Sequence, residues 1–434
     1  MPVPRSGRPA LVAAAAAVAL TAGIMVAPAA GAADGTLPGV TPRAETPAMF
    51  DDDEGGNSNA DDPAIWRNTA DPDASLVVAT AKKGGLRVYN LDAEQVQSLP
   101  APPAPGPDDA PGRFNNVDLV HGMKLGPGPA DLAVTSDRGS DKLRIYRIDG
   151  DKHDAPLTDV TAPTAPWIFS SSQDEVNHKS TAYGLTTYTD PHTGKAYALV
   201  SQAATTRIAL LELKATGDGK VSYEQVRTVD LPDTFTMPDG TKWSPCGDPG
   251  DGPQVEGMVV DPETGTLFAG QEDVGIWRLP AGLDGKPVLQ DKVREYGIPA
   301  TYDKPSDKCV AGKDPGFGGE RVSADVEGLT LVRQDGGDGY LLASSQGDNT
   351  FVAYDREKAD GYEYEGGFRV APGKEVDGSE ECDGADALAE PLGSKYPHGL
   401  LVVQDGHANP EDGDRAATGF KFVDLGDVLT ALDD

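Results

Sequence analysis

A two-part sequence phrase returns six times along this chain of 434 residues, and no other feature limits its possible folds so strongly. The first part is a polar or acidic cluster that runs into apolar residues. Its copies begin at Asp61, Asn115, Ser180, Gln254, Asp325 and Asp383. The second part follows about 15 residues later as a short apolar strand that ends in small or polar residues. Its copies begin at Leu76, Leu132, Ala198, Leu267, Leu341 and Leu400.

The spacing of these copies, roughly 55 to 75 residues, is typical of strand pairs repeated around a ring or along a solenoid. The 52 glycines and 36 prolines suit a loop-rich, all-β chain, and no long stretch shows a helical period. The sequence therefore predicts an all-β, six-bladed β-propeller whose blades are antiparallel sheets of four to five strands. A strand from Phe420 to Val423 is expected to close the ring by pairing near the N-terminus.

The beginning of the chain has the pattern of an export signal. Two arginines precede an apolar run that ends at Val26, and an Ala-Gly-Ala sequence follows. This pattern predicts a signal peptide over residues 1–32 and a secreted protein. Residues 33–52 are rich in Pro, Thr, Gly and Ala and are expected to form a flexible leader. The propeller domain would then span residues 53–434, where no stretch is apolar enough to cross a bilayer.

The net charge of −33 limits the class of partner. A chain this acidic is repelled by nucleic acid and by anionic membranes, so neither is expected as a partner. The charge favours cation binding or simple solubility outside the cell. We also expect a monomer.

Three cysteines occur, Cys246, Cys309 and Cys382. Export permits a disulfide, but the sequence alone does not fix the pairing. Cys246 and Cys309 both lie in loops rich in Gly, Pro and Asp, so we expect those two to pair.

The usual hydrolase signatures are absent from the sequence. It contains no Gly-x-Ser-x-Gly elbow, no Gly-Lys-Ser/Thr phosphate loop and no His-Glu-x-x-His zinc motif. Carboxylate oxygens are abundant instead, and such hard oxygens select calcium or magnesium over zinc.

If the repeats are blades, the acidic first phrases meet on one axis. Carboxylates crowded there would raise one another's pKa values unless divalent cations bind. Basic residues at the ends of two second phrases would lie beside them, at Lys82, Lys83 and Arg138. Such a mixture suits a polyanionic oxyacid. The alternative is that the Asp-Pro, Glu-Gly and Asp-Gly pairs only form turns and that the lysines are ordinary hairpin charges.

Several motifs of this sequence resemble those of the β-propeller phytases, a family of secreted, calcium-dependent phosphatases. They occur in the family's order from Asp61 to the C-terminus and include Asp61-Asp62-Pro63-Ala64-Ile65-Trp66, Asn115-Asn116-Val117-Asp118, Ala81-Lys82-Lys83-Gly84-Gly85-Leu86, Asp325-Val326-Glu327-Gly328-Leu329 and Gln404-Asp405-Gly406. The resemblance implies stepwise hydrolysis of phytate (myo-inositol hexakisphosphate, as a calcium complex) at a site with several Ca²⁺ ions.

The resemblance also implies roles for individual residues. The implied metal ligands are Asp62, Glu256, Glu272, Asp325, Glu327 and Asp377. The implied catalytic residues are Glu256, Glu272, Glu327 and Tyr183, with Tyr183 between metal and phosphate. The implied phosphate-binding cations are Lys82, Lys83 and Arg138, with Lys179 as a candidate for a second phosphate site. Ser58 and Ala203 depart from the family pattern, which usually has an acidic residue and a lysine there, and the segment from Lys242 to Gly252 looks like an addition.

Two other classes of function remain open from the sequence. A calcium-stabilised propeller that binds a glycan or a protein would explain the repeats and the carboxylates, but not the positions of Lys82, Lys83 and Arg138. A propeller lactonase or phosphodiesterase is the other alternative. A lactonase would need calcium ligands but no cluster of phosphate-binding cations.

Overall fold

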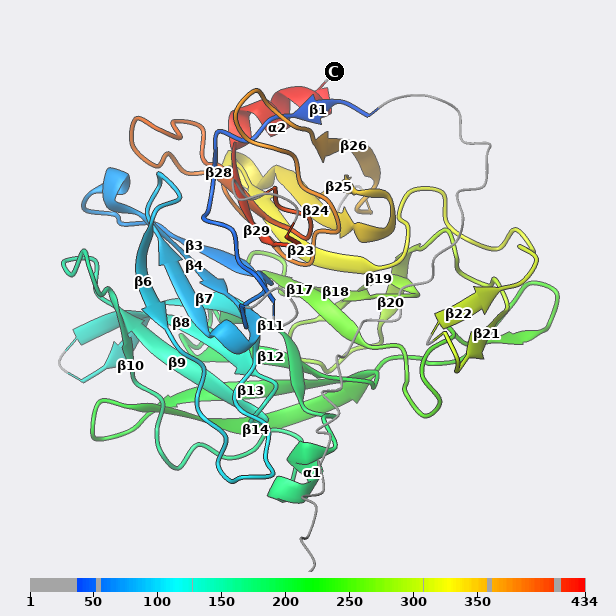
Figure 1. Ribbon diagram of the computed structural model, residues 1–434, viewed down its shortest axis with the longest axis horizontal. Coiled ribbons are helices and arrows are strands. Elements are labelled where there is room, and N and C mark those ends of the chain that lie inside the picture. The colour runs from blue at the N-terminus through cyan, green and yellow to red at the C-terminus, as the bar shows by residue number, and fades with distance from the viewer. Residues whose placement is uncertain are drawn as a thin grey trace, which may run out of the picture.

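The computed structural model describes residues 37–51, 56–126, 128–306, 308–356, 361–409 and 415–433. The predicted signal peptide therefore lies outside the described residues. Strands dominate, and six sheets of four or five strands surround a common centre (Figure 1). The described helices are α1 (Gln173–Asn177) and α2 (Leu425–Asp433), and neither could span a bilayer.

The first three blades are consecutive four-stranded meanders. Blade one contains β3 (Pro63–Trp66), β4 (Leu76–Thr80), β5 (Leu86–Tyr89) and β6 (Gln95–Leu99). Blade two contains β7 (Phe114–Leu125), β8 (Gly128–Asp137), β9 (Lys142–Ile148) and β10 (Leu157–Asp159). Blade three contains β11 (Ala182–Thr189), β12 (Ala196–Gln202), β13 (Arg207–Ala215) and β14 (Val221–Asp230).

The other three blades follow the same order, and two of them also include an N-terminal strand. Blade four contains β17 (Val255–Asp261), β18 (Thr266–Gln271), β19 (Gly275–Pro280) and β20 (Val288–Lys292). Blade five contains β23 (Val326–Arg333), β24 (Gly339–Ser345), β25 (Thr350–Asp355), β26 (Tyr364–Val370) and β1 (Gly39–Val40). Blade six contains β27 (Ala385–Leu388), β28 (Leu400–Asp405), β29 (Gly419–Asp424) and β2 (Ala44–Glu45).

The innermost strands form a closed ring. Each contacts its two neighbours in the order β3, β7, β11, β17, β23, β27 and back to β3. These are the strands that the six first phrases enter, and the second phrases form the adjacent strands. The second strand of blade one, β4, is buried at every position because neighbouring blades cover both of its faces, which explains its continuous apolar run. The prediction of a six-bladed propeller with antiparallel blades is confirmed.

Part of the segment that we expected to be a flexible leader is built into the sheets. β1 pairs in parallel with β26, and β2 pairs antiparallel with β29, with Ala44 opposite Phe422. The outer edges of the last two blades carry unpaired backbone groups, and these two short strands satisfy some of them. The pairing of the Phe420–Val423 strand with the N-terminal region is confirmed.

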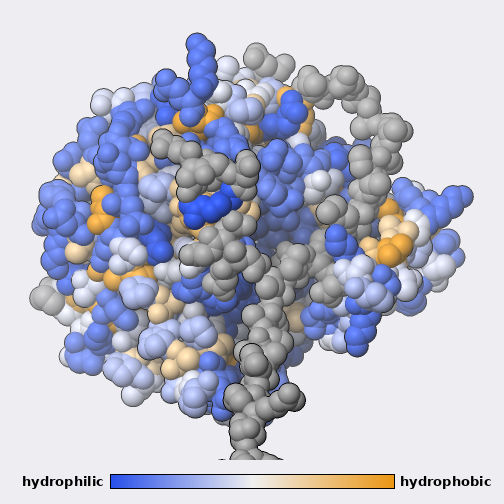
Figure 2. Space-filling view, in the orientation of Figure 1, coloured by the Kyte–Doolittle hydropathy of each residue, from blue (hydrophilic) through white to orange (hydrophobic). Residues whose placement is uncertain are grey.

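Two small hairpins lie outside the six blades, on the connections that flank blade four. They are β15 (Phe235–Thr236) with β16 (Lys242–Trp243), and β21 (Ala300–Asp303) with β22 (Lys308–Ala311). The β21–β22 hairpin projects from the ring, and apolar atoms show on it in an otherwise mostly hydrophilic face (Figures 1 and 2). A disulfide joins Cys309 on β22 to Cys246, as predicted, and Cys382 is buried and free.

Candidate functional site

Four of the six inner strands break their regular pairing near their first residues. The register shifts between Phe114 and Val117, Ala182 and Leu185, Val255 and Met258, and Val326 and Leu329. Such bulges leave extra residues unpaired and redirect a side chain. The first bulge holds Asn115 and Asn116, and the other three hold Tyr183, Glu256 and Glu327, each followed by glycine. The repeated fold thus places one polar side chain from each of these blades at the same level of the axis.

The glycine after each of these side chains is required by the neighbouring blade. A Cβ on Gly257 would lie 1.9 Å from the carbonyl oxygen of Glu327, and one on Gly184 would lie 2.1 Å from that of Glu256. Any larger residue would push the blades apart. The Glu-Gly pairs are therefore packing features of the inner strands, because both residues lie inside β17 and β23.

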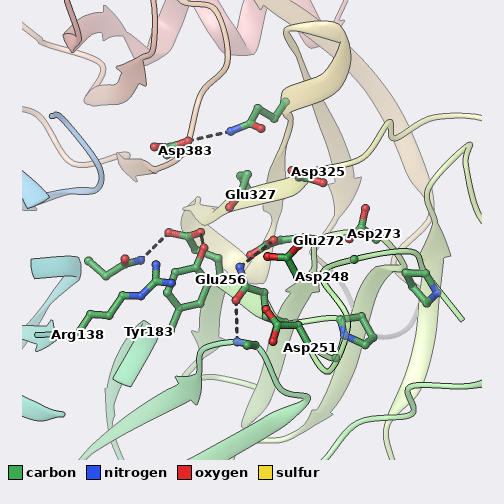
Figure 3. Close-up of a pocket in the computed structure, with 18 of the residues that line it drawn as sticks. Arg138, Tyr183, Asp248, Asp251, Glu256, Glu272, Asp273, Asp325, Glu327 and Asp383 are labelled. Atoms are coloured by element: carbon green, nitrogen blue, oxygen red, sulfur yellow. Dashed lines mark hydrogen bonds between the residues drawn. The ribbon is translucent and has the colours of Figure 1, made fainter. Parts of the chain in front are cut away.

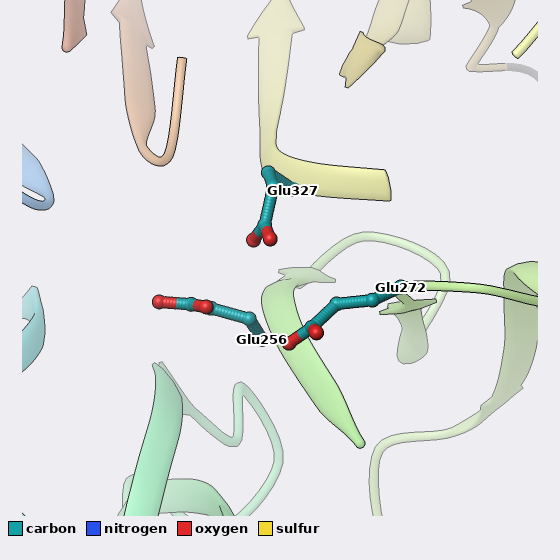
Figure 4. Close-up of side chains that lie close together, drawn as sticks. All are labelled: Glu256, Glu272 and Glu327. Carbon is teal, nitrogen blue, oxygen red and sulfur yellow. The ribbon is translucent and has the colours of Figure 1, made fainter. Parts of the chain in front are cut away.

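Three glutamates converge at this level. One carboxylate oxygen from each of Glu256, Glu272 and Glu327 lies within 4.8 Å of the other two, and all three side chains are buried. Figure 4 shows them projecting from separate segments toward one central space. Among the described residues, Oε1 of Glu272 and Oε2 of Glu327 have no hydrogen-bond partner. Unpartnered buried oxygens of this kind are costly unless a proton or a cation occupies the space between them.

Polar neighbours hold two of these glutamates in place. The hydroxyl of Tyr183 donates to Oε2 of Glu256, and Nδ2 of Asn115 donates to Oε1 of Glu256 at 2.6 Å. Nε2 of Gln254 donates to Oε2 of Glu272 at 3.1 Å. Burial and the charge of Glu256 raise the pKa of Tyr183 well above its ordinary value, so its hydroxyl stays protonated and remains a donor.

The glutamates lie in a cavity of about 290 Å³ (Figure 3). Three cations line it, Lys82, Arg113 and Arg138. Nine carboxylates line it as well: Asp61, Asp248, Asp251, Glu256, Glu272, Asp273, Asp325, Glu327 and Asp383. Three divalent ions would balance this excess of six negative charges.

The cost of this crowding is visible in the pKa values of the carboxyl groups. Burial, then the nearby carboxylates, raise the pKa of Glu272 and of Glu327 well above the ordinary value. Burial and the charge of Glu256 raise the pKa of Asp325 to about 7. Because every donor atom is a hard carboxylate, amide or phenol oxygen, the set fits calcium and does not resemble a zinc site.

The cations differ in their partners. Nζ of Lys82 lies 3.1 Å from Asp61 and 3.0 Å from Asp383. Although burial opposes its charge, the carboxylates of Asp383 and Asp61 raise the pKa of Lys82, which stays protonated. The guanidinium of Arg138 stacks over the ring of Tyr183, 4.8 Å from its centroid. Both cations face the central carboxylates, so the cavity can neutralise an anion as well as hold a metal.

The structure brings most of the predicted site residues together. Those that line the cavity are Lys82, Arg138, Tyr183, Glu256, Glu272, Asp325 and Glu327. Lys83 does not line it, because it is the exposed residue of the turn after β4. Lys179 is also exposed and lies just beyond α1. Ala203, at the departure from the family pattern, is fully buried.

Two predicted metal ligands lie elsewhere. Oδ2 of Asp62 accepts a hydrogen bond from the backbone N–H of Val117 at 2.9 Å, so this carboxylate joins blade one to blade two. Asp61, the preceding residue, lines the cavity instead. Asp377 lies away from this cavity, where its carboxylate pairs with the ammonium of Lys421.

Several cavity residues were not among the predicted ligands or cations. Arg113 precedes β7. The only feature of the sequence that could have indicated it is its place just before the first phrase that begins at Asn115. Asp248 and Asp251 lie on the loop that contains Cys246, and the disulfide ties that loop to the β21–β22 hairpin. A loop position of this kind has no counterpart in the repeat, so the sequence pattern could not reveal it.

Comparison with known proteins gives sequence relatives across almost the whole chain. A sequence model of the family described as Phytase matches residues 8–237 and 251–434, so residues 238–250 fall between the matched stretches. The chain is 32% identical over 372 residues to the 3-phytase of Bacillus subtilis (strain 168), which covers 85% of this chain and 80% of that protein.

Solved structures show weaker likeness. A calcium-binding protein, regucalcin, from Agrobacterium tumefaciens is 11% identical, with a TM-score of 0.44 over 89% of this chain and 96% of that one. The WD40 repeats of RRP9 are 9% identical, with a TM-score of 0.42 over 88% of this chain and 99% of that one.

Proposed function

The chain belongs to the phytase family, and from that premise we propose that it is a secreted enzyme that uses bound calcium to hydrolyse phytate. Phosphate leaves myo-inositol hexakisphosphate as inorganic phosphate, and each cleaved C–O–P linkage gives a free hydroxyl. The substrate is a small molecule, which we propose enters as a calcium complex. The chain acts as a monomer, without nucleic acid or a membrane.

The observation that carries the calcium requirement is the convergence of Glu256, Glu272 and Glu327. Their three oxygens lie within 4.8 Å of one another, and two buried oxygens of the set lack a partner in the described structure. A cation at this place removes the mutual repulsion that raises the pKa values of these groups. Calcium accepts six to eight oxygens in flexible geometry, which suits ligands drawn from two different blades. The excess of carboxylates over cations supports several ions rather than one.

Different residues of the cavity would hold the metal and bind the phosphate. Glu256, Glu272 and Glu327 would hold the metal, and Asp325 lies beside them in the same cavity. Calcium, when bound, supplies a polarised water and offsets the charge of the phosphate. Lys82 and Arg138 face the same space and would neutralise the non-bridging oxygens of the reacting phosphate. The absence of a serine, cysteine or histidine nucleophile motif favours direct attack by water.

The hydroxyl of Tyr183 stays protonated and lies against Glu256, between the carboxylates and Arg138. A phenol has one proton, so the hydroxyl would donate to a phosphate oxygen by turning away from Glu256, whose carboxylate would then be held by the cation. Secretion rests on the basic and apolar pattern of residues 1–32.

The first experiment is phosphate release from phytate by the purified protein, with calcium and again after exhaustive chelation. We expect release with calcium, none after chelation, and a lower melting temperature of the chelated protein because calcium binds the folded state. Full activity after chelation would exclude the metal mechanism. A folded protein that releases no phosphate in either state would exclude phytate hydrolysis. Parallel assays on a phosphodiester and a lactone distinguish the other propeller hydrolases.

A further inference from the structure

A second guanidinium, from Arg113, shares the cavity with Arg138. The backbone N–H of Arg138 donates to the carbonyl oxygen of Arg113 at 2.8 Å, and the N–H of Arg113 donates to Oδ1 of Asp137 at 3.0 Å. These bonds join the start of β7 to the end of β8. They fix the two arginine backbones opposite each other, so both side chains enter the cavity from one edge of blade two.

Neither arginine has a carboxylate partner within the described part of the chain. Lys82 forms ion pairs with both Asp61 and Asp383, whereas the guanidinium of Arg138 stacks on the ring of Tyr183. The guanidinium of Arg113 makes no hydrogen bond or ion pair with any described residue. Burial, then the charge of Arg138, lower the pKa of Arg113, and a guanidinium still remains charged.

Two like charges in one cavity repel each other when no anion lies between them. Nine carboxylates line the same cavity, so the lack of partners reflects where the backbone holds these side chains and not a shortage of anions. Such an arrangement is stabilised when an external anion binds between the two charges. Each guanidinium offers a planar fork of N–H donors that matches two oxygens of a phosphate group.

We propose that Arg113 and Arg138 together clamp one phosphate group of the substrate, which makes Arg113 a further phosphate-binding residue. This inference rests on the proposed function for the identity of the phosphate as part of phytate. The clamp lies on blade two, and the metal-holding glutamates come from blades four and five. The phosphate would therefore be held from blade two, while the glutamates of blades four and five hold the metal.

The test compares Arg113→Met, Arg113→Lys and Arg138→Met with Arg147→Met, an exposed arginine on β9 of the same blade. Each variant is assayed for kcat/KM on phytate, for the inhibition constant of inorganic phosphate, and for calcium binding and melting temperature. We expect Arg113→Met to lower kcat/KM and weaken phosphate inhibition, each by about 10- to 100-fold. Arg113→Lys should lie between it and the wild type, because it keeps the charge and loses the fork. Calcium binding should be unchanged.

A structural role for Arg113 would move the melting temperature and leave phosphate inhibition unchanged, and that result would overturn the proposal. So would an Arg113→Met variant equal to Arg147→Met in both kinetic readouts. If Arg113→Met does not fold, an Arg113→Lys variant with wild-type phosphate affinity would overturn it as well. The losses in the Arg113→Met, Arg138→Met double variant should be smaller than the product of the single losses, because both arginines bind one group. Phosphate binding that depends on Arg113, in a wild type inactive on phytate, would refute the proposed function and not the clamp.

Discussion

Two groups of three carboxylates in this molecule differ in how the repulsion between their negative charges is reduced. In the axial cavity, Glu256, Glu272 and Glu327 converge without an ammonium between them. At blade six, Glu45 of β2, Asp405 of β28 and Asp377 of the connection that enters the blade surround the ammonium of Lys421, whose side chain is 1% exposed. The second group carries its own counter-ion, and the first does not.

The pKa of Asp377 reflects this difference, whereas burial outweighs the charge of Lys421 at Glu45 and Asp405 and keeps their pKa values raised. Burial raises the pKa of Asp377, but the hydrogen bonds from Lys421 and Glu45 and the charge of Lys421 together outweigh it, so the pKa lies below its ordinary value. Burial and neighbouring carboxylates raise the pKa of Glu272 and Glu327, and no described ammonium pairs with either carboxylate. We therefore expect a metal at the axial group, where no ammonium of the described chain lies between the converging carboxylates, rather than beside Lys421. This difference also explains why Asp377, which sequence similarity implied as a metal ligand, lies apart from the axial set.

The largest expected effect comes from removing the internal counter-ion with Lys421→Met. Three carboxylates would then be left without their buried partner, which should cost about 3–5 kcal/mol of unfolding free energy. Lys195→Met is the matched control, because Lys195 forms an exposed pair with Glu212 and should cost at most about 1 kcal/mol. Denaturant unfolding of the chelated proteins measures both.

The same variant sharpens the comparison when calcium is added. Without Lys421, the blade-six carboxylates resemble the axial group, so calcium should stabilise Lys421→Met more than it stabilises the wild type. Equal losses in the two lysine variants would show that the ammonium does not neutralise the cluster. If calcium stabilises Lys421→Met and the wild type equally, the blade-six carboxylates do not bind calcium as the axial group is expected to.

The next largest effect is expected for Glu327→Gln, which removes one charge from the axial group at nearly constant shape. We expect kcat/KM on phytate to fall by about 10²- to 10³-fold, because a group that holds the charge-stabilising ion is lost. Glu390→Gln, an exposed residue outside the cavity lining, is the control and should retain full activity. Similar activities of the two variants would contradict the assignment of Glu327.

The sequence repeat predicts the positions of several cavity residues but not of all of them. The positions of Tyr183, Glu256 and Glu327 could be predicted because each occupies the same place in its blade. The repeat could not separate Asp61 from Asp62, since they are adjacent residues before β3, of which one lines the cavity and the other bonds to blade two. Asp248 and Asp251 depend on a disulfide-tied loop outside the repeat. The ion pair of Asp377 depends on Lys421 from the closing strand, which only the folded ring brings near.

The pH dependence of stability should differ between the metal-free and calcium-loaded protein. Burial and the charge of Glu256 raise the pKa of Asp325 from 3.8 to about 7 in the metal-free fold. The folded state then holds a proton that the unfolded chain releases, so this contribution is fully present below pH 3.8 and is lost as the pH rises through about 7. The melting temperature of the chelated protein should fall by a few degrees over that interval.

Calcium should remove most of this dependence, because the ion replaces the proton as the neutralising charge. Melting curves at several pH values, with and without calcium, make the comparison directly. Calorimetric titration with calcium near pH 6 should also show proton release, seen as a dependence of the heat on the buffer. A chelated protein whose stability rises from pH 4 to pH 7 would contradict the predicted protonation of the axial group.

The smallest expected effect distinguishes Asp61 from Asp62. Asp61→Asn removes a charge from the cavity and one of the two carboxylates that hold Lys82, so kcat/KM should fall by about 10-fold. Asp62→Asn keeps an oxygen that can accept the hydrogen bond from Val117, so its activity should stay within about threefold of wild type. A greater loss of activity in Asp62→Asn than in Asp61→Asn would reverse the assignment and place the metal-facing carboxylate at the position that sequence similarity implied. Asp61 and Asp62 are adjacent and both buried, so they differ mainly in the direction of their side chains. The relative activities of the two variants therefore show which carboxylate faces the metal.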